Sequence, residues 1–197
     1  MIPQTAVDVL KRNRQLILVV RETVTSYTSA CCIQDEKRQT LRDGLIRVLV
    51  HLKPLNGPSV VVRVDQAPEF RTLQDDPFLK QFIISVEVDR VKNPNKHPVA
   101  IKAIAEFEDE LLSEEHGESP ISELTLAVAT ARLNSRLRQK GLSSRELWTQ
   151  RNQFTQEQLS IFDMNVIREQ QESRNINHGF IETSKCRKPP RTVQDFM

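Results

Sequence analysis

The sequence predicts an α/β fold in which a mixed β-sheet is flanked by helices. β-Branched and apolar residues cluster at 16–20, 59–64 and 83–88, as in strands that are buried on both faces. Apolar residues three and four positions apart predict amphipathic helices over 41–52 and 99–112. With a further strand over 27–33 and a short helical stretch over 77–82, the elements up to residue 88 follow the order β-β-α-β-α-β, which is typical of a sheet with helices packed on its faces.

Length and charge fit one domain with a polar extension. The chain has 197 residues, of which 38% are hydrophobic and 27% charged, so it can bury a real core. We expect a basic approach segment over 1–14, a core over 15–153 and a polar, partly disordered extension over 154–197. The net charge is only +2, so any affinity for nucleic acid must come from local clusters of Lys and Arg.

Cysteine and histidine usage excludes two classes of small stabilised domain. Three cysteines, two of them adjacent, make no disulfide framework and favour a reducing compartment, nuclear or cytoplasmic. The four histidines are scattered and have no CxxC partner, so no structural zinc site is expected. No apolar run reaches membrane-spanning length, and the N-terminus lacks the features of a signal peptide.

The first half of the chain predicts a strand pair and a helix. The strand at 16–20 and a strand over 27–33 form an antiparallel pair across a turn at 23–26. The following helix carries Leu41, Leu45, Val48 and Leu52 on one face, with Gly44 in its middle. Glycine weakens a helix interior, so Gly44 is expected where the helix packs closely on the sheet.

Three helices are expected in the second half. The first carries Ile104, Phe107 and Leu111 in its apolar stripe. Ser119 and Pro120 predict the start of the next, whose buried side comprises Leu124, Val128, Ala131 and Leu137. A capping box over 143–146 predicts a short helix that bears Trp148, an anchoring core residue.

Asp65 is the first candidate for chemistry. It follows the strand at 59–64, and Ala67 and Pro68 end that strand. Open α/β sheets bind their ligands at the carboxyl ends of the strands, so a carboxylate here is well placed for a site. The alternative is a capping or turn aspartate, which is common at such positions. Glu69, beyond the strand end, is interpreted as a helix-start acid.

Several ordered segments together resemble the catalytic core of retroelement integrases, most closely the gypsy-like class of LTR retrotransposons. Residues 22–27, Glu-Thr-Val-Thr-Ser-Tyr, are similar to that family's Asp-x-Phe-Ser-x-Tyr segment, and residues 65–70 to its Asp-Asn-Gly-x-Glu-Phe segment. Residues 93–102 resemble its loop and following helix, and residues 133–134 and 141–149 its closing elements. The resemblance covers roughly residues 10–152 and implies an RNase H-like fold. The His/Cys zinc domain that precedes this core in complete integrases has no counterpart, as in a fragment, a truncated copy or a domesticated derivative.

The resemblance also implies a site of three acids that bind two Mg²⁺ or Mn²⁺ ions, the arrangement used for in-line displacement on a phosphodiester. It places the acids at Glu22, Asp65 and position 101, with thirty-five residues between the last two. Position 101 is Ile101, which supplies no oxygen, and Glu108 is about 10 Å further along the helix. We therefore expect impaired strand transfer. The alternative for Glu22 is an ordinary surface glutamate at a strand end.

Nucleic acid is the partner that the resemblance implies. Lys92, Lys96 and Lys102 belong to the loop and helix that approach DNA in this family, although they could equally be solvated. The leading hypothesis is a nucleic-acid-binding integrase core of retrotransposon origin, associated with DNA integration and close to a pseudoenzyme. A domesticated, non-catalytic module for dimerisation or protein partners, or a truncated relic, is the alternative.

Overall fold

The computed structural model describes residues 4–54, 57–88, 98–114, 120–138, 141–169 and 172. Two compact units divide the chain, over 1–158 and 159–197. The second contains a helix over 161–169, whose N-terminus is capped by Ser160, with its hydroxyl 3.2 Å from the backbone nitrogen of Asp163. No helix within the described residues is both long and apolar enough to cross a bilayer.

The first unit is built on a five-stranded mixed sheet with the strand order β3-β2-β1-β4-β5. Strands β1, β2 and β3 form an antiparallel meander, whereas β4 and β5 run parallel to β1. The strands are β1 (Gln4–Arg12), β2 (Gln15–Glu22), β3 (Thr28–Ile33), β4 (Val60–Val64) and β5 (Ile84–Val88). The predicted α/β class with a mixed sheet is confirmed.

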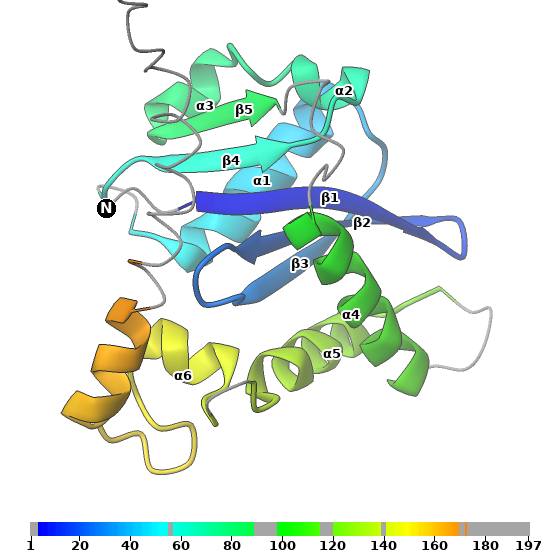
Figure 1. Ribbon diagram of the computed structural model, residues 1–197. Coiled ribbons are helices and arrows are strands. Elements are labelled where there is room, and N and C mark those ends of the chain that lie inside the picture. The colour runs from blue at the N-terminus through cyan, green and yellow to red at the C-terminus, as the bar shows by residue number, and fades with distance from the viewer. Residues whose placement is uncertain are drawn as a thin grey trace, which may run out of the picture. The chain divides into compact units, whose positions relative to one another are not determined.

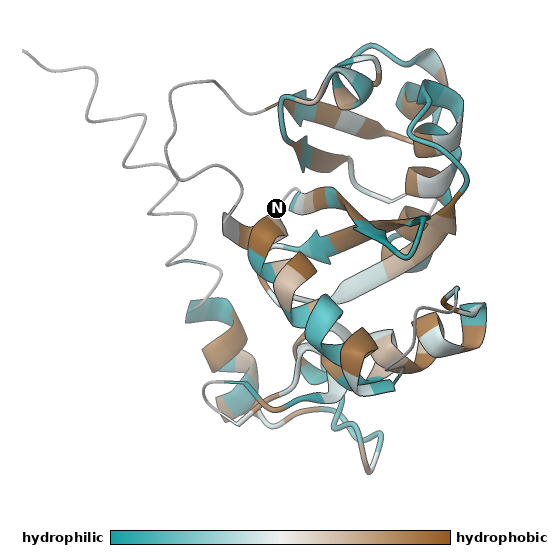
Figure 2. Ribbon diagram, turned by 90° about the vertical axis from the view of Figure 1, so that its right-hand side faces the viewer, coloured by the Kyte–Doolittle hydropathy of each residue, from teal (hydrophilic) through white to brown (hydrophobic). Residues whose placement is uncertain are grey.

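Six helices accompany the sheet in the described part of this unit. They are α1 (Arg38–Leu52), α2 (Pro68–Arg71), α3 (Pro77–Gln81), α4 (Pro98–Glu114), α5 (Glu123–Ser135) and α6 (Ser144–Thr149). Helix α1 lies behind the sheet in Figure 1 and α4 in front of it. Apolar residues occupy long stretches of the strands in Figure 2, in keeping with a sheet covered on both sides.

Each face of the sheet has its own hydrophobic core. On one face, Val7, Val20 and Val62 pack with the buried side of α1. On the other, Leu10, Ile17 and Val19 pack with Phe107 and Leu111 of α4 and with α5. Since side chains alternate along a strand, these two clusters identify the face to which every strand residue points.

The N-terminal segment differs from the expectation. Residues 1–14 were expected to precede the core, yet Gln4–Arg12 forms the central strand, paired with both β2 and β4. A two-residue turn joins it to β2, with Asn13 and Arg14 at φ of 48° and 61°. Positive φ at both central positions is characteristic of a type I′ hairpin turn. Asp8 and Lys11 interrupt the apolar residues of β1, so the strand has no long continuous apolar run.

Local signals within helices gave mixed results. The capping box of Ser143 and Glu146 is present, and Trp148 stacks on Tyr27 with ring centroids 5.6 Å apart. A Cβ at Gly44 would lie 3.1 Å from side-chain atoms of Leu18 and Ile33, which confirms close packing on the sheet.

The predicted start and buried face of the helix after residue 119 were wrong. Helix α5 starts at Glu123 with Ser122 as its cap, and its buried face is Leu126, Ala129, Leu133 and Asn134. Leu124 and Leu137 are 74% and 66% exposed.

Candidate functional site

Asp8 and Asp65 occupy neighbouring positions on the two parallel strands at the centre of the sheet. The register of β1 and β4 pairs Gln4 with Val61 and Ala6 with Arg63. Extending this register by two residues places Asp8 across from Asp65, the first residue after β4. Both side chains are partly exposed. Two carboxylates therefore lie together at the carboxyl ends of parallel strands, where such sheets bind ligands.

The two aspartates also point to the same face of the sheet. Asp8 pairs with Val19, which belongs to the core beneath α4 and α5. Asp65 follows Val64, whose side chain lies in the core on the α1 side, so by alternation Asp65 points to the α4 side. Each carboxylate accepts a short local bond: Asp8 from the backbone nitrogen of Val9 at 2.8 Å, and Asp65 from that of Ala67 at 2.9 Å.

The structure does not bring Glu22 to this pair. Glu22 lies at the end of β2 and pairs with Thr5, three residues from Asp8 along β1, roughly 10 Å at about 3.3 Å per residue. Thr5 also pairs with Val62, whose side chain lies in the α1-side core, so Glu22 is on the opposite face from Asp65. The predicted convergence of 22 and 65 is therefore absent.

The carboxylate of Glu22 is instead bound by its own turn. It is 4% exposed and accepts hydrogen bonds from the backbone nitrogens of Val24 and Thr25, at 2.9 and 2.5 Å. The hydroxyl of Thr25 donates a third bond at 2.7 Å. Both carboxylate oxygens thus stabilise the turn between β2 and β3. Neither is directed at the face of the sheet that carries Asp8 and Asp65.

Ile101 lies in the first turn of α4, the helix that packs on β1 and β2. Ala100 and Ala103 on either side are buried, whereas Ile101 is 59% exposed. No group of three or more His, Cys, Asp or Glu residues that could hold a metal occurs among the described residues. The aspartate pair therefore has no third acidic partner in the part of the chain that the structure describes.

Of the lysines expected at a nucleic-acid surface, Lys92 and Lys96 lie outside the described residues. Lys102 is in the first turns of α4, with 70% of its side chain exposed, and its amino group lies 3.7 Å from the Glu106 carboxylate. Glu69 lies in the first turn of the short helix α2, which begins at Pro68, in keeping with its interpretation as a helix-start acid.

Sequence reasoning missed Asp8. The available signal was the alternation of Val7 and Val9 on one side with Ala6, Asp8 and Leu10 on the other, which is a strand pattern. Its partnership with Asp65 depends on pairing between strands more than fifty residues apart, and local sequence patterns do not encode that pairing.

Comparison with known proteins identifies the fold. No family model and no curated protein sequence matches the chain. Among solved structures, the catalytic core domain of BIV integrase aligns with a TM-score of 0.60 and 20% identity, over 74% of this chain and 92% of that one. The fold is that of an integrase catalytic core.

A second integrase-related structure gives a similar result. A chain of the simian T-cell lymphotropic virus intasome, solved in complex with the PP2A regulatory subunit B56 gamma, aligns with a TM-score of 0.60 and 16% identity. The alignment covers 73% of this chain and 52% of that one, so the present chain spans about half of its length. At these identities, the likeness establishes the integrase-core fold.

Proposed function

We propose that this protein is an integrase-core-like protein of retroelement origin, of the gypsy-like class, that binds DNA and is impaired in strand transfer. The observation that carries the proposal is the position of Asp8 beside Asp65 on one face, together with Ile101 in the helix that packs on the same face. The integrase-core fold supports the origin, and the incomplete acid set supports the impairment.

The first acid of the proposed site is Asp8 in place of Glu22. The carboxylates of Asp8 and Asp65 would hold one Mg²⁺ or Mn²⁺, with water completing its shell of oxygen ligands. When bound, that ion would supply positive charge beside a phosphodiester. Two aspartates do not provide the ligand set of a two-ion site, and Ile101 adds no donor. The protein is therefore proposed to bind the ion weakly and to join DNA ends poorly.

DNA is the proposed partner, since the sequence resemblance concerns a family that acts on DNA and one of the aligned structures is an intasome. We also propose that the protein forms a homodimer. A nuclear or cytoplasmic location is consistent with Cys31 and Cys32, which are both free thiols.

A strand-transfer assay on the purified chain with Mn²⁺ tests the activity. We expect negligible joining, and robust joining would overturn the impaired-site proposal. Ile101→Glu adds the missing donor and is expected to raise Mg²⁺ affinity in a calorimetric titration. Asp8→Asn in the Ile101→Glu background should abolish that gain, whereas Glu22→Gln should leave it unchanged. Loss of the gain in Glu22→Gln with retention in Asp8→Asn would return the first acid to position 22.

A further inference from the structure

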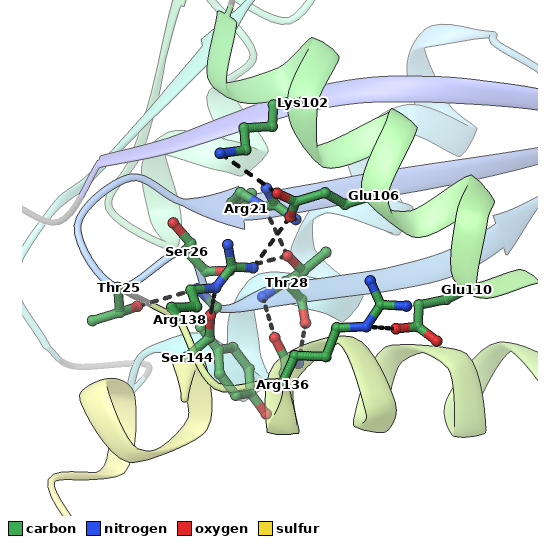
Figure 3. Close-up of polar contacts among 12 residues, drawn as sticks. Arg21, Thr25, Ser26, Thr28, Lys102, Glu106, Glu110, Arg136, Arg138 and Ser144 are labelled. Carbon is green, nitrogen blue, oxygen red and sulfur yellow. Dashed lines mark hydrogen bonds and ion pairs between the residues drawn. The ribbon is translucent and has the colours of Figure 1, made fainter. Parts of the chain in front are cut away.

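Three cationic side chains converge on one carboxylate between α4, β2 and the segment after α5 (Figure 3). A terminal nitrogen of Arg21 lies 2.8 Å from Oε2 of Glu106, and one of Arg138 lies 3.2 Å from the same oxygen. The amino group of Lys102 is 3.7 Å from Oε1. We name Arg21, Lys102, Arg138 and Glu106 the cation cluster.

The cation cluster carries excess positive charge. Three cations face one anion, which leaves two positive charges, and no other carboxylate of the described residues forms an ion pair with them. The side chain of Arg21 is only 2% exposed, so its field is weakly screened by water. Burial tends to raise the pKa of Glu106, but the hydrogen bond from Arg138 and the charges of Arg21 and Arg138 lower it overall, as expected in a positive potential.

Two side chains of the cation cluster are exposed to solvent, at least in part. Lys102 has 70% of its side chain exposed and Arg138 has 21%, while Arg21 lies behind them. The guanidinium of Arg138 is also held by the hydroxyl of Ser144, to which its Nε donates at 2.6 Å. A guanidinium oriented in this way loses little freedom on binding an anion, and its remaining donors match phosphate oxygens.

We propose that Lys102 and Arg138, with the buried charge of Arg21 behind them, form a subsite for a phosphate of a nucleic-acid backbone. Lys102 of this subsite directly follows Ile101 in α4. The subsite lies on the same face of the sheet as Asp8 and Asp65. It rests on the proposed DNA binding and names the residues that would contact the backbone beside the aspartate pair. A purely structural bridge needs one cation for Glu106, whereas three cations share this single carboxylate among the described residues.

The test is fluorescence anisotropy of the full chain with a labelled 20-base-pair DNA duplex, titrated at several NaCl concentrations. Each phosphate contact contributes about −0.9 to the slope of log Kobs against log[NaCl]. We expect Lys102→Ala and Arg138→Gln each to make this slope less negative by about 0.9. Lys80→Ala is the matched control, because it removes an exposed lysine from α3 that pairs with Asp75. It should leave the slope unchanged.

The outcomes separate this inference from the proposed function. A wild-type chain that does not bind the duplex at low salt overturns both. A wild-type chain that binds, with unchanged slopes in Lys102→Ala and Arg138→Gln, overturns the subsite alone. The same holds if Lys80→Ala changes the slope equally. Arg138→Lys preserves the charge and is expected to keep the wild-type slope. If Arg138→Gln fails to fold, the slopes of Arg138→Lys and Lys102→Ala together decide.

Discussion

Arg21 of β2 is buried against Glu106 of α4, with 2% of the arginine side chain exposed and 2.8 Å between their charged atoms. Its Nε also donates to the hydroxyl of Thr28 at 2.9 Å. The pair joins the sheet to the helix that carries position 101. Burial lowers the pKa of Arg21 and the nearby Glu106 carboxylate acts in the opposite direction. Since a guanidinium stays protonated in proteins, Glu106 compensates a buried positive charge.

Removing that carboxylate should destabilise the fold strongly. Glu106→Gln leaves Arg21 buried without an anion, and breaking a buried pair in this way typically costs about 3–5 kcal/mol. Urea unfolding followed by circular dichroism measures the change. Glu123→Gln is the control, because Glu123 is 64% exposed and 3.9 Å from Arg47; it should shift stability by less than about 0.5 kcal/mol. Equal losses in both variants would contradict the assigned role.

The same pair predicts a pH dependence. The folded-state pKa of Glu106 is lowered, so the group contributes stability that is fully present above its ordinary pKa of 4.5 and is lost as the pH falls through the folded value. The stability difference between wild type and Glu106→Gln should therefore be constant from pH 7 to about 5 and shrink in more acidic solution. Urea midpoints at a series of pH values test it, and a difference that grows on acidification would contradict the sign.

Glu22 provides a test of structural against metal-binding roles. Its two oxygens accept three bonds within the turn that follows β2, and Gln would direct an amide group at those same donors. We expect Glu22→Gln to lose about 1–3 kcal/mol of unfolding free energy. Asp8→Asn should cost less, because Asp8 is partly exposed and asparagine keeps an oxygen that can accept the bond from the Val9 backbone nitrogen. The opposite ranking in urea unfolding would contradict this assignment.

Much of the fold could be predicted from the sequence, because the signals concerned are local. The capping box of Ser143 and Glu146 acts within four residues, and the valines of β4 mark a buried strand without knowledge of its neighbours. Gly44 was informative because a helix rarely contains glycine without a packing reason. The integrase resemblance added the expectation of an RNase H-like mixed sheet, which composition alone could not supply.

The candidate site could be predicted only in part, because it depends on pairing between distant strands. Asp65 ends a recognisable strand. Asp8 interrupts the apolar residues of β1, and its place beside Asp65 depends on the register with β4. Glu22 matched a family motif by sequence, yet the alternation of β2 turns it to the other face. The buried face of α5 shifted because Ser122, three residues after Ser119, is the cap.

The side chain of Asn134 is expected to stabilise β3, the edge strand of the sheet that it contacts. This buried side chain of α5 accepts a bond from the backbone nitrogen of Thr28 at 2.8 Å and donates to its carbonyl at 2.7 Å, as a neighbouring strand would. Asn134→Ala leaves both backbone groups unpaired, and a buried unsatisfied group costs about 1–3 kcal/mol. We expect a loss of that order in urea unfolding and faster hydrogen exchange at the Thr28 amide, because its bond to α5 is gone. Asn134→Asp retains the acceptor but loses the donor, so it should protect the Thr28 amide better than alanine. Equal exchange in the two variants would show that the amide is protected by something other than this side chain.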